Sequence, residues 1–212
     1  MLASEDIPEN DPWWFRQPIS GNAVTSILDK PTQRAAFRQI RDSYVNGLTA
    51  QDRSLAFSKI PSPLAKFLAP GKIVAGYVAK GSEVDPAAIL AQAHAMGCDL
   101  ALPHVTSKSA PMRFLRWSPD DDLVPGAFGL LQPAETAPEC KPDIVLVPML
   151  AYDDRLIRLG QGAGHYDRAL SVLDQSIAIG LAWSVQFTSV LASDIWDVPL
   201  DAVLTEKSWI TL

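Results

Sequence analysis

The chain has 212 residues, of which 48% are hydrophobic and 20% are charged, and its formal net charge at pH 7 is −6. This length and composition are typical of one globular α/β domain with a sizeable core. The acidic balance argues against nucleic-acid binding, which needs a basic face. No apolar run is long enough to span a bilayer, and the acidic start of the chain lacks the apolar centre of a secretory signal. We therefore expect a cytoplasmic protein that binds neither nucleic acid nor a membrane.

The first part of the chain, residues 1–29, predicts no regular structure. It contains three prolines and no helical or strand periodicity, so we expect an N-terminal extension followed by a single domain over residues 30–212. The extension carries the cluster Trp13-Trp14-Phe15. Such a cluster is too apolar for a fully solvated tail, so it is expected to dock on the domain or on a partner subunit. Self-association through the extension is therefore an open alternative.

Helices and strands alternate along the rest of the chain. The first half predicts helices over residues 31–46, 49–59 and 85–97, and strands over 73–79, 99–102 and 112–117. After a proline-rich loop at 119–142, the second half predicts strands over 144–147, 177–182 and 202–204 and a helix over 166–173. This alternation predicts an α/β fold with a single open, mostly parallel sheet and helices on both faces, a Rossmann-like arrangement. Ligands of such sheets bind beyond the carboxyl ends of the strands.

The most informative segment follows the apolar run at 144–147. It reads Arg158-Leu-Gly-Gln-Gly-Ala-Gly-His-Tyr-Asp-Arg168. Glycines let a loop expose its backbone N–H groups to a ligand, and arginine binds phosphate through two parallel hydrogen bonds. An aspartate just past the glycines is a ligand type suited to the magnesium of a nucleotide. The spacing matches neither a dinucleotide-binding G-x-G-x-x-G nor a P-loop, and a glycine-rich surface turn is the alternative. We interpret the segment as a nucleotide phosphate site.

Together with the preceding Val147-Pro-Met-Leu-Ala-Tyr-Asp153, this segment resembles the signature of the 5-formyltetrahydrofolate cyclo-ligase (5,10-methenyltetrahydrofolate synthetase) family. The resemblance covers most of residues 30–206 and is strongest over 144–168. It implies an ATP-dependent carbon–nitrogen cyclo-ligase that uses Mg2+. Its substrate would be 5-formyltetrahydrofolate, with or without a polyglutamate tail, and its products 5,10-methenyltetrahydrofolate, ADP and phosphate. Two alternatives keep the fold, namely a nucleotide- or folate-binding regulator without turnover and a sugar-phosphate isomerase-like enzyme.

The resemblance also implies roles for individual residues. Lys30 and Arg34, one helical turn apart, would bind ATP, and Lys30 and Arg158 would be the catalytic cations. The nucleotide-binding segment implied by the resemblance is Arg158, Leu159, Gly160, Gln161, Gly162, Ala163, Gly164, His165 and Tyr166. The residues implied to contact the folate are Val78, Glu83 and Tyr166, and those implied to hold Mg2+ are Asp167 and Asp197.

Other residues stand apart from the family pattern. The chain departs from it at Gln132, Ala163, His165 and Trp196. Arg38 and Arg41 continue the helical face of Lys30 and Arg34, but the resemblance implies no role for them. Without such a role, a basic face of this kind is expected to be a solvated stripe.

Overall fold

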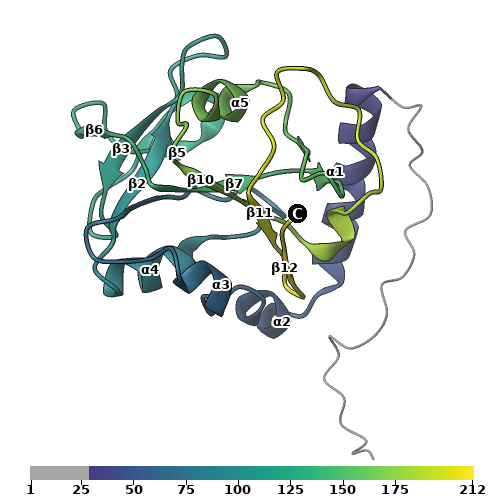
Figure 1. The fold of residues 1–212 in the computed structure, drawn as a ribbon, viewed down its shortest axis with the longest axis horizontal. Coiled ribbons are helices and arrows are strands. Elements are labelled where there is room, and N and C mark those ends of the chain that lie inside the picture. The colour runs from purple at the N-terminus through teal and green to yellow at the C-terminus, as the bar shows by residue number, and fades with distance from the viewer. Residues whose placement is uncertain (1–28) are drawn as a thin grey trace, which may run out of the picture.

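The computed structural model describes residues 29–212, so the Trp13-Trp14-Phe15 cluster lies outside the described residues. Eight strands form one sheet in the order β12-β11-β10-β7-β1-β2-β3-β6 (Figure 1). The five strands from β11 to β2 run parallel, and the pairings at both edges are antiparallel. The prediction of one open, mostly parallel sheet is therefore confirmed. The bounds of the strands are β1 Ile73–Ala75, β2 Asp99–His104, β3 Arg113–Trp117, β6 Glu139–Cys140, β7 Ile144–Pro148, β10 Ile177–Leu181, β11 Ala202–Leu204 and β12 Trp209–Ile210.

Helices cover both faces of this sheet, as predicted (Figure 1). Helices α2 to α4 lie along one face and α5 lies on the other, while α1 runs past the end of the sheet. No helix in the part of the chain from 29 to 212 is long and apolar enough to cross a membrane. The bounds of the helices are α1 Lys30–Gly47, α2 Ala50–Leu55, α3 Ser62–Ala65, α4 Ala87–Ala95, η2 Ala127–Gly129, α5 His165–Leu170 and η3 Ser184–Gln186.

The direction in which the parallel strands are added changes between β1 and β7. Strand β2 lies on one side of β1, whereas β7, β10 and β11 follow one another on the other side. Such a switch point opens a crevice at the carboxyl ends of the two strands, and ligands of α/β sheets bind there. The loops that follow β1 and β7 therefore start at the edge of the sheet where a ligand site is expected.

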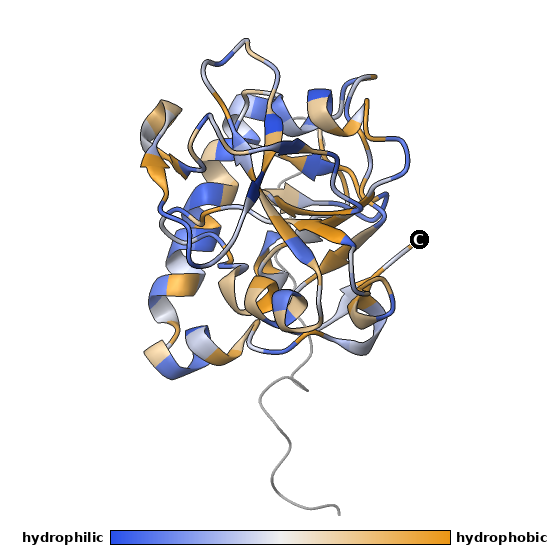
Figure 2. Ribbon diagram, turned by 90° about the vertical axis from the view of Figure 1, so that its left-hand side faces the viewer, coloured by the Kyte–Doolittle hydropathy of each residue, from blue (hydrophilic) through white to orange (hydrophobic). Residues whose placement is uncertain are grey.

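Strand residues alternate between two apolar layers, because successive side chains of a strand point to opposite faces. In β7, Ile144 and Leu146 belong to the layer beneath α2 to α4, whereas Val145 and Val147 belong to the layer beneath α5. All four are at most 1% exposed. Figure 2 shows the same concentration of hydrophobic residues on the central strands. A strand covered on both faces needs an unbroken apolar run, which explains the pattern at 144–147.

Several predicted boundaries are wrong for local reasons. Strand β2 continues through Pro103 to His104, where it pairs with the antiparallel β3. Its parallel neighbour β1 pairs only up to Ala101, so the missing N–H of Pro103 leaves no ladder position empty. Helix α2 ends before residue 59 because the Ser58 hydroxyl donates to the Leu55 carbonyl oxygen at 2.9 Å.

Other boundaries shift at element starts and in short elements. Helix α4 starts at Ala87 because the Asp85 carboxylate accepts a hydrogen bond from the Ala87 N–H at 2.9 Å. Strand β1 is shorter than the predicted 73–79, and α5 ends before residue 173. The elements not predicted from sequence are α3, η2, η3, β12, β6 and four further two-residue strands, namely β4 Val124–Pro125, β5 Leu131–Gln132, β8 Ala151–Tyr152 and β9 Arg158–Leu159. The division into an extension (1–29) and one domain (30–212) stays a prediction.

Candidate nucleotide and folate site

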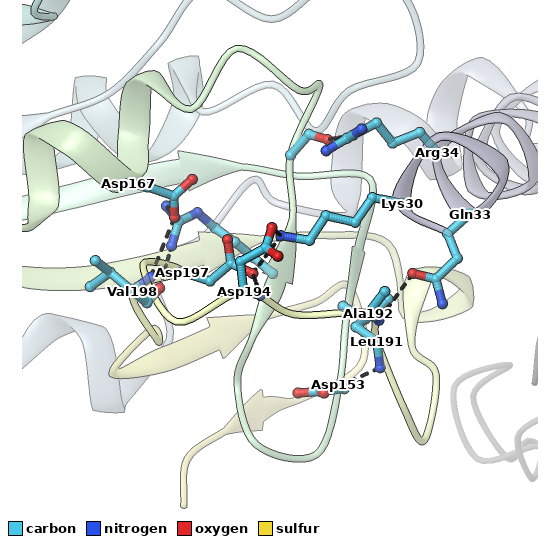
Figure 3. A network of polar contacts seen from close by, with 12 residues as sticks. Lys30, Gln33, Arg34, Asp153, Asp167, Leu191, Ala192, Asp194, Asp197 and Val198 are labelled. Carbon is cyan, nitrogen blue, oxygen red and sulfur yellow. Dashed lines mark hydrogen bonds and ion pairs between the residues drawn. The ribbon is translucent and has the colours of Figure 1, made fainter. Parts of the chain in front are cut away.

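Helix α1 presents the first basic residues of the site. It begins at Lys30 because the Asp29 carboxylate caps it, accepting a hydrogen bond from the Thr32 N–H at 2.9 Å. Pro31 in the first turn is already shaped for a helix. The predicted helix start is thus confirmed. Lys30 and Arg34 lie one turn apart near the start of this helix, and their side chains reach Asp197 and Gly160 (Figure 3).

The ammonium group of Lys30 lies between two carboxylates (Figure 3). Its Nζ is 2.6 Å from Asp197 Oδ2 and 2.7 Å from Asp194 Oδ2. Burial alone would lower the pKa of Lys30, but the hydrogen bonds with Asp194 and Asp197 outweigh it and raise this pKa. Asp194 is a site residue that the sequence analysis misses. Its signal is the Asp-x-x-Asp spacing, which the backbone closes through a 2.7 Å bond from the Asp194 N–H to Asp197 Oδ2.

The glycine loop lies directly against α1. The Gly160 carbonyl oxygen accepts a hydrogen bond from Arg34 Nε at 3.0 Å. Gly162 has φ +101° and Gly164 has φ +67°, which are left-handed values that favour glycine. A Cβ atom added to Gly162 would also lie 3.2 Å from Arg34 Cζ. The left-handed backbone at position 162 therefore favours glycine, and a larger residue there would also displace the Arg34 side chain slightly.

Arg158 starts the glycine loop but is itself buried, with a side chain only 4% exposed. Its Nη2 donates to Asp167 Oδ1 at 2.6 Å, and its Nη1 donates to the Val198 carbonyl oxygen. Burial lowers the pKa of Arg158, and the charges of Asp167 and Asp197 oppose this effect. An arginine remains protonated at neutral pH all the same. Arg158 thus ties the start of the loop to α5 and to the segment around Asp197.

Two polar atoms at the start of α5 are buried without a partner. Neither the Tyr166 hydroxyl nor His165 Nε2 has a hydrogen-bond partner among residues 29–212. Burial and the charge of Glu83 raise the pKa of Tyr166, so its hydroxyl stays a donor. Burial and the charge of Arg168 lower the pKa of His165, which keeps the imidazole neutral at pH 7. An unpartnered buried polar group costs about 1–3 kcal/mol, so both atoms are suited to bind a ligand or water.

The loop after β1 brings Glu83 to the glycine loop. Glu83 Oε2 accepts from the Lys80 N–H at 3.0 Å, and its Oε1 accepts from Gln161 Nε2 at 3.3 Å. The Gln161 Oε1 atom accepts in turn from Arg38 Nη2 at 2.7 Å. Val78 packs at the margin of the core close to this loop. The structure therefore brings Glu83, one of the predicted folate residues, into contact with Gln161 of the predicted nucleotide loop.

Asp167 and Asp197 lie on neighbouring segments. Asp167 Oδ1 accepts a 3.4 Å hydrogen bond from the N–H of Val198, the residue after Asp197. Within residues 29–212 no group of three or more His, Cys, Asp or Glu side chains is arranged to hold a metal ion. Protein carboxylates often supply only one or two ligands to Mg2+, and water and nucleotide phosphates supply the others. Asp167 and Asp197 are two carboxylates of this kind on neighbouring segments, and in this structure their cationic partners are Arg158 and Lys30.

The remaining candidates divide between backbone and side-chain positions. Leu159 is 1% exposed and packs in the core, so only its backbone faces the loop. The Ala163 carbonyl oxygen accepts from Arg168 Nη1 at 3.0 Å. Gln132 is 7% exposed, and its Oε1 accepts a hydrogen bond from the Val105 N–H at 3.1 Å. The neutral amide of Gln132 therefore holds the backbone at Val105. Trp196 is exposed beside Asp197.

A separate cavity lies at the other edge of the sheet. Its volume is about 520 Å³, and its lining includes Asp99 at the start of β2 and Trp117 at the end of β3. None of the predicted site residues lines it. The chemistry suggested by the glycine loop therefore belongs to the carboxyl edge and not to this cavity.

The fold and the site define a class of protein. A parallel α/β sheet carries a glycine loop, a basic helix face and two aspartates at its carboxyl edge, which is the arrangement of an α/β enzyme whose ligand site lies beyond the ends of the strands.

Comparison with known proteins identifies the family. The model of the 5-formyltetrahydrofolate cyclo-ligase family matches residues 27–206. A 5-formyltetrahydrofolate cyclo-ligase of Escherichia coli is 30% identical over 144 residues, which cover 64% of this chain and 79% of that protein. One of Haemophilus influenzae is 36% identical over 97 residues, which cover 43% of this chain but only 52% of that protein. The solution structure of Aquifex aeolicus 5,10-methenyltetrahydrofolate synthetase has a TM-score of 0.69 at 28% identity, covering 87% of this chain and 93% of that one.

The chain belongs to the 5-formyltetrahydrofolate cyclo-ligase family, whose members are carbon–nitrogen ligases. The resemblance of the glycine-loop signature to this family is therefore confirmed.

Proposed function

We propose that this protein converts 5-formyltetrahydrofolate and ATP to 5,10-methenyltetrahydrofolate, ADP and phosphate with the help of Mg2+. The observation that supports this most is the meeting of the glycine loop with Glu83 at the switch point, in a chain of this family. The names of the Escherichia coli and Aquifex aeolicus relatives state the same substrate and product. The cofactors and the residue roles below are part of the proposal.

The chemical problem is that the formyl oxygen is a poor leaving group. In the proposed reaction this oxygen attacks the γ-phosphorus of ATP, and the bond between that phosphorus and ADP breaks. The folate N10 then attacks the formyl carbon, the carbon–oxygen bond breaks, phosphate departs and N10 loses its proton. Such a route needs positioning and charge neutralisation more than a covalent protein intermediate.

Phosphate charge would be balanced by the cations of the site. Lys30, Arg34 and Arg158 would bind the phosphates as charged donors, and the backbone N–H groups of residues 160–164 would surround them. Asp167 and Asp197 would hold Mg2+, which supplies charge neutralisation on phosphate oxygens. Lys30 already pairs with Asp197. We therefore expect the Lys30 ammonium group to lie between the Asp197 carboxylate and the phosphates and to offset the negative charge of both.

The reduced folate would lie on the side of the loop after β1. A carboxylate accepts two neighbouring hydrogen bonds, which suits Glu83 to the N–H groups of a pterin. The Tyr166 hydroxyl, a buried donor without a protein partner among residues 29–212, would bind an acceptor of the ligand. Val78 would contribute apolar contact.

The test is a spectrophotometric assay for 5,10-methenyltetrahydrofolate with purified protein, Mg-ATP and 5-formyltetrahydrofolate. We expect product that depends on both ATP and Mg2+ and that appears with one ADP for each turnover. A folded protein that binds both ligands without forming product would instead be a regulator. A protein that binds neither ligand but isomerises a sugar phosphate would overturn the assignment of the site.

A further inference from the structure

Arg41 is a buried cation for which the proposed reaction has no use. It lies on α1 seven residues after Arg34 and is only 4% exposed. The expectation of a solvated basic stripe along this helix is therefore wrong at Arg41. Arginines are almost never fully buried unless they are paired, so the partners of this guanidinium group indicate what it does.

The guanidinium group of Arg41 connects three segments. Its Nε donates to the Ser82 hydroxyl oxygen at 2.9 Å, in the loop after β1. Its Nη1 donates to the Met149 carbonyl oxygen at 3.3 Å, just past the end of β7. The same Nη1 lies 3.8 Å from Glu83 Oε1. Arg41 thus joins α1 to the loops that follow both strands of the switch point.

Neighbouring groups hold these segments without a positive charge. Trp183 Nε1 donates to the Ser82 carbonyl oxygen at 3.1 Å, and the Tyr77 hydroxyl donates to the Val84 carbonyl oxygen at 2.7 Å. Gln186 Nε2 donates to the Met149 carbonyl oxygen at 2.8 Å. The Ser82 hydroxyl also donates to the Asp42 carboxylate. None of these bonds places a positive charge beside Glu83, and that charge is what Arg41 adds.

Stability alone does not explain a buried charge at this position. Replacing a buried ion pair by apolar residues of similar volume is often neutral or stabilising, because desolvation offsets the attraction between the charges. Burial lowers the pKa of Arg41, while Glu83 and Asp42 oppose this effect, so the group remains a cation beside a carboxylate that is itself only 13% exposed. A buried charge that adds little stability is better explained by the orientation of its partner.

We propose that Arg41 is a positioning residue for the reduced folate: it fixes the Glu83 carboxylate at the switch point, facing the glycine loop. Arg41 does not touch the substrate itself. The inference rests on the proposed function, because Glu83 is taken to bind the folate. It predicts that loss of Arg41 weakens the binding of folate but not that of ATP. This effect should disappear when Glu83 has lost its carboxylate.

The experiment compares Arg41→Met, Arg41→Lys, Glu83→Gln and the double variant Arg41→Met/Glu83→Gln in the full chain. Arg53→Met is the matched control, because Arg53 also donates to a backbone oxygen, that of Val45 at 2.8 Å, but on α2 away from the site. We expect Arg41→Met to raise KM for 5-formyltetrahydrofolate about tenfold or more, which is roughly the effect of losing one charge-assisted hydrogen bond between Glu83 and the folate. KM for ATP should change less than about twofold, and Arg41→Lys should restore part of the folate affinity.

The double variant separates positioning from a structural role. If Arg41 acts through Glu83, Arg41→Met should change folate KM by less than about twofold in the Glu83→Gln background. Independent, multiplicative effects of the two substitutions would overturn the proposal, as would equal losses for folate and ATP. If Arg41→Met does not fold, as circular dichroism would show, Arg41→Lys with and without Glu83→Gln gives the same comparison.

Failure of the proposed function gives a different result. If the wild-type protein makes no 5,10-methenyltetrahydrofolate, the reaction is wrong, and calorimetric titration with 5-formyltetrahydrofolate still compares wild type with the Arg41 variants. Weaker folate binding by Arg41→Met than by Arg53→Met would then support positioning. Equal binding by all variants would overturn it.

Discussion

Replacing Arg158 by alanine tests whether this arginine both binds phosphate and holds the glycine loop together. Its side chain is 4% exposed and donates to Asp167 and to the Val198 carbonyl oxygen. Removing one partner of a buried ion pair costs about 3–5 kcal/mol. We expect about 3 kcal/mol less free energy of unfolding, the low end, because Asp167 is 26% exposed and regains water. ATP affinity should fall roughly ten- to hundredfold, since one charge-assisted phosphate bond is worth about 1.5–3 kcal/mol.

Denaturant unfolding and calorimetric titration with ATP measure the two effects separately. Arg158→Lys is the control, because it keeps the charge but loses the planar fork that serves Asp167 and Val198 together. It should therefore retain more ATP affinity than Arg158→Ala while losing part of the stability. Wild-type stability in Arg158→Ala would refute the reasoning about the buried pair, and an unchanged ATP affinity would remove Arg158 from the phosphate site.

Three further changes test other parts of the site. Asp167→Asn and Asp197→Asn keep hydrogen-bonding capacity but weaken a metal ligand, so each should raise the Mg2+ concentration for half-maximal turnover about tenfold, or about 1.4 kcal/mol; wild-type dependence on Mg2+ in both would make them structural residues. A chain that starts near Thr25 should keep its turnover because the removed residues precede every matched motif, and a folded but inactive truncation would contradict this. Because the pKa of His165 is lower in the folded chain, the unfolded chain binds a proton at this residue that the folded chain does not. This difference holds from about pH 6.5 down to the pKa of His165 in the folded chain. Stability should therefore fall with decreasing pH in that window, and His165→Gln should flatten this part of the stability curve measured by denaturant unfolding; an unchanged slope would contradict the burial argument.

The elements that could be predicted from sequence are those with a local cause. The run at 144–147 is apolar throughout because β7 is covered on both faces, and α1 starts where Asp29 and Pro31 favour a helix start. The glycine loop could also be predicted from sequence, because the left-handed backbone at Gly162 and Gly164 favours glycine at both positions.

The features that the sequence does not reveal depend on contacts between distant segments. Arg38 and Arg41 look alike at helical spacing, yet Arg41 is buried because the loop around Ser82 folds over it. Asp194 lies in a segment without periodicity, and its role depends on Lys30, 164 residues earlier. Strand β2 continues past Pro103 because the neighbouring β1 ends earlier, so β1 offers no partner that the missing N–H of Pro103 would have to bind.

The contact between Lys30 and Asp197 also affects how this protein is made. The two residues are 167 positions apart, so the first helix leaves the ribosome long before its acidic partners are synthesised. At about 5–20 residues per second, that interval is roughly 10–30 s. During this time the basic end of α1 has no carboxylate from residues 194–197 to neutralise it, and an assembled site requires nearly the whole chain. Nascent chains and C-terminal truncations that stop before residue 194 are therefore expected to be inactive.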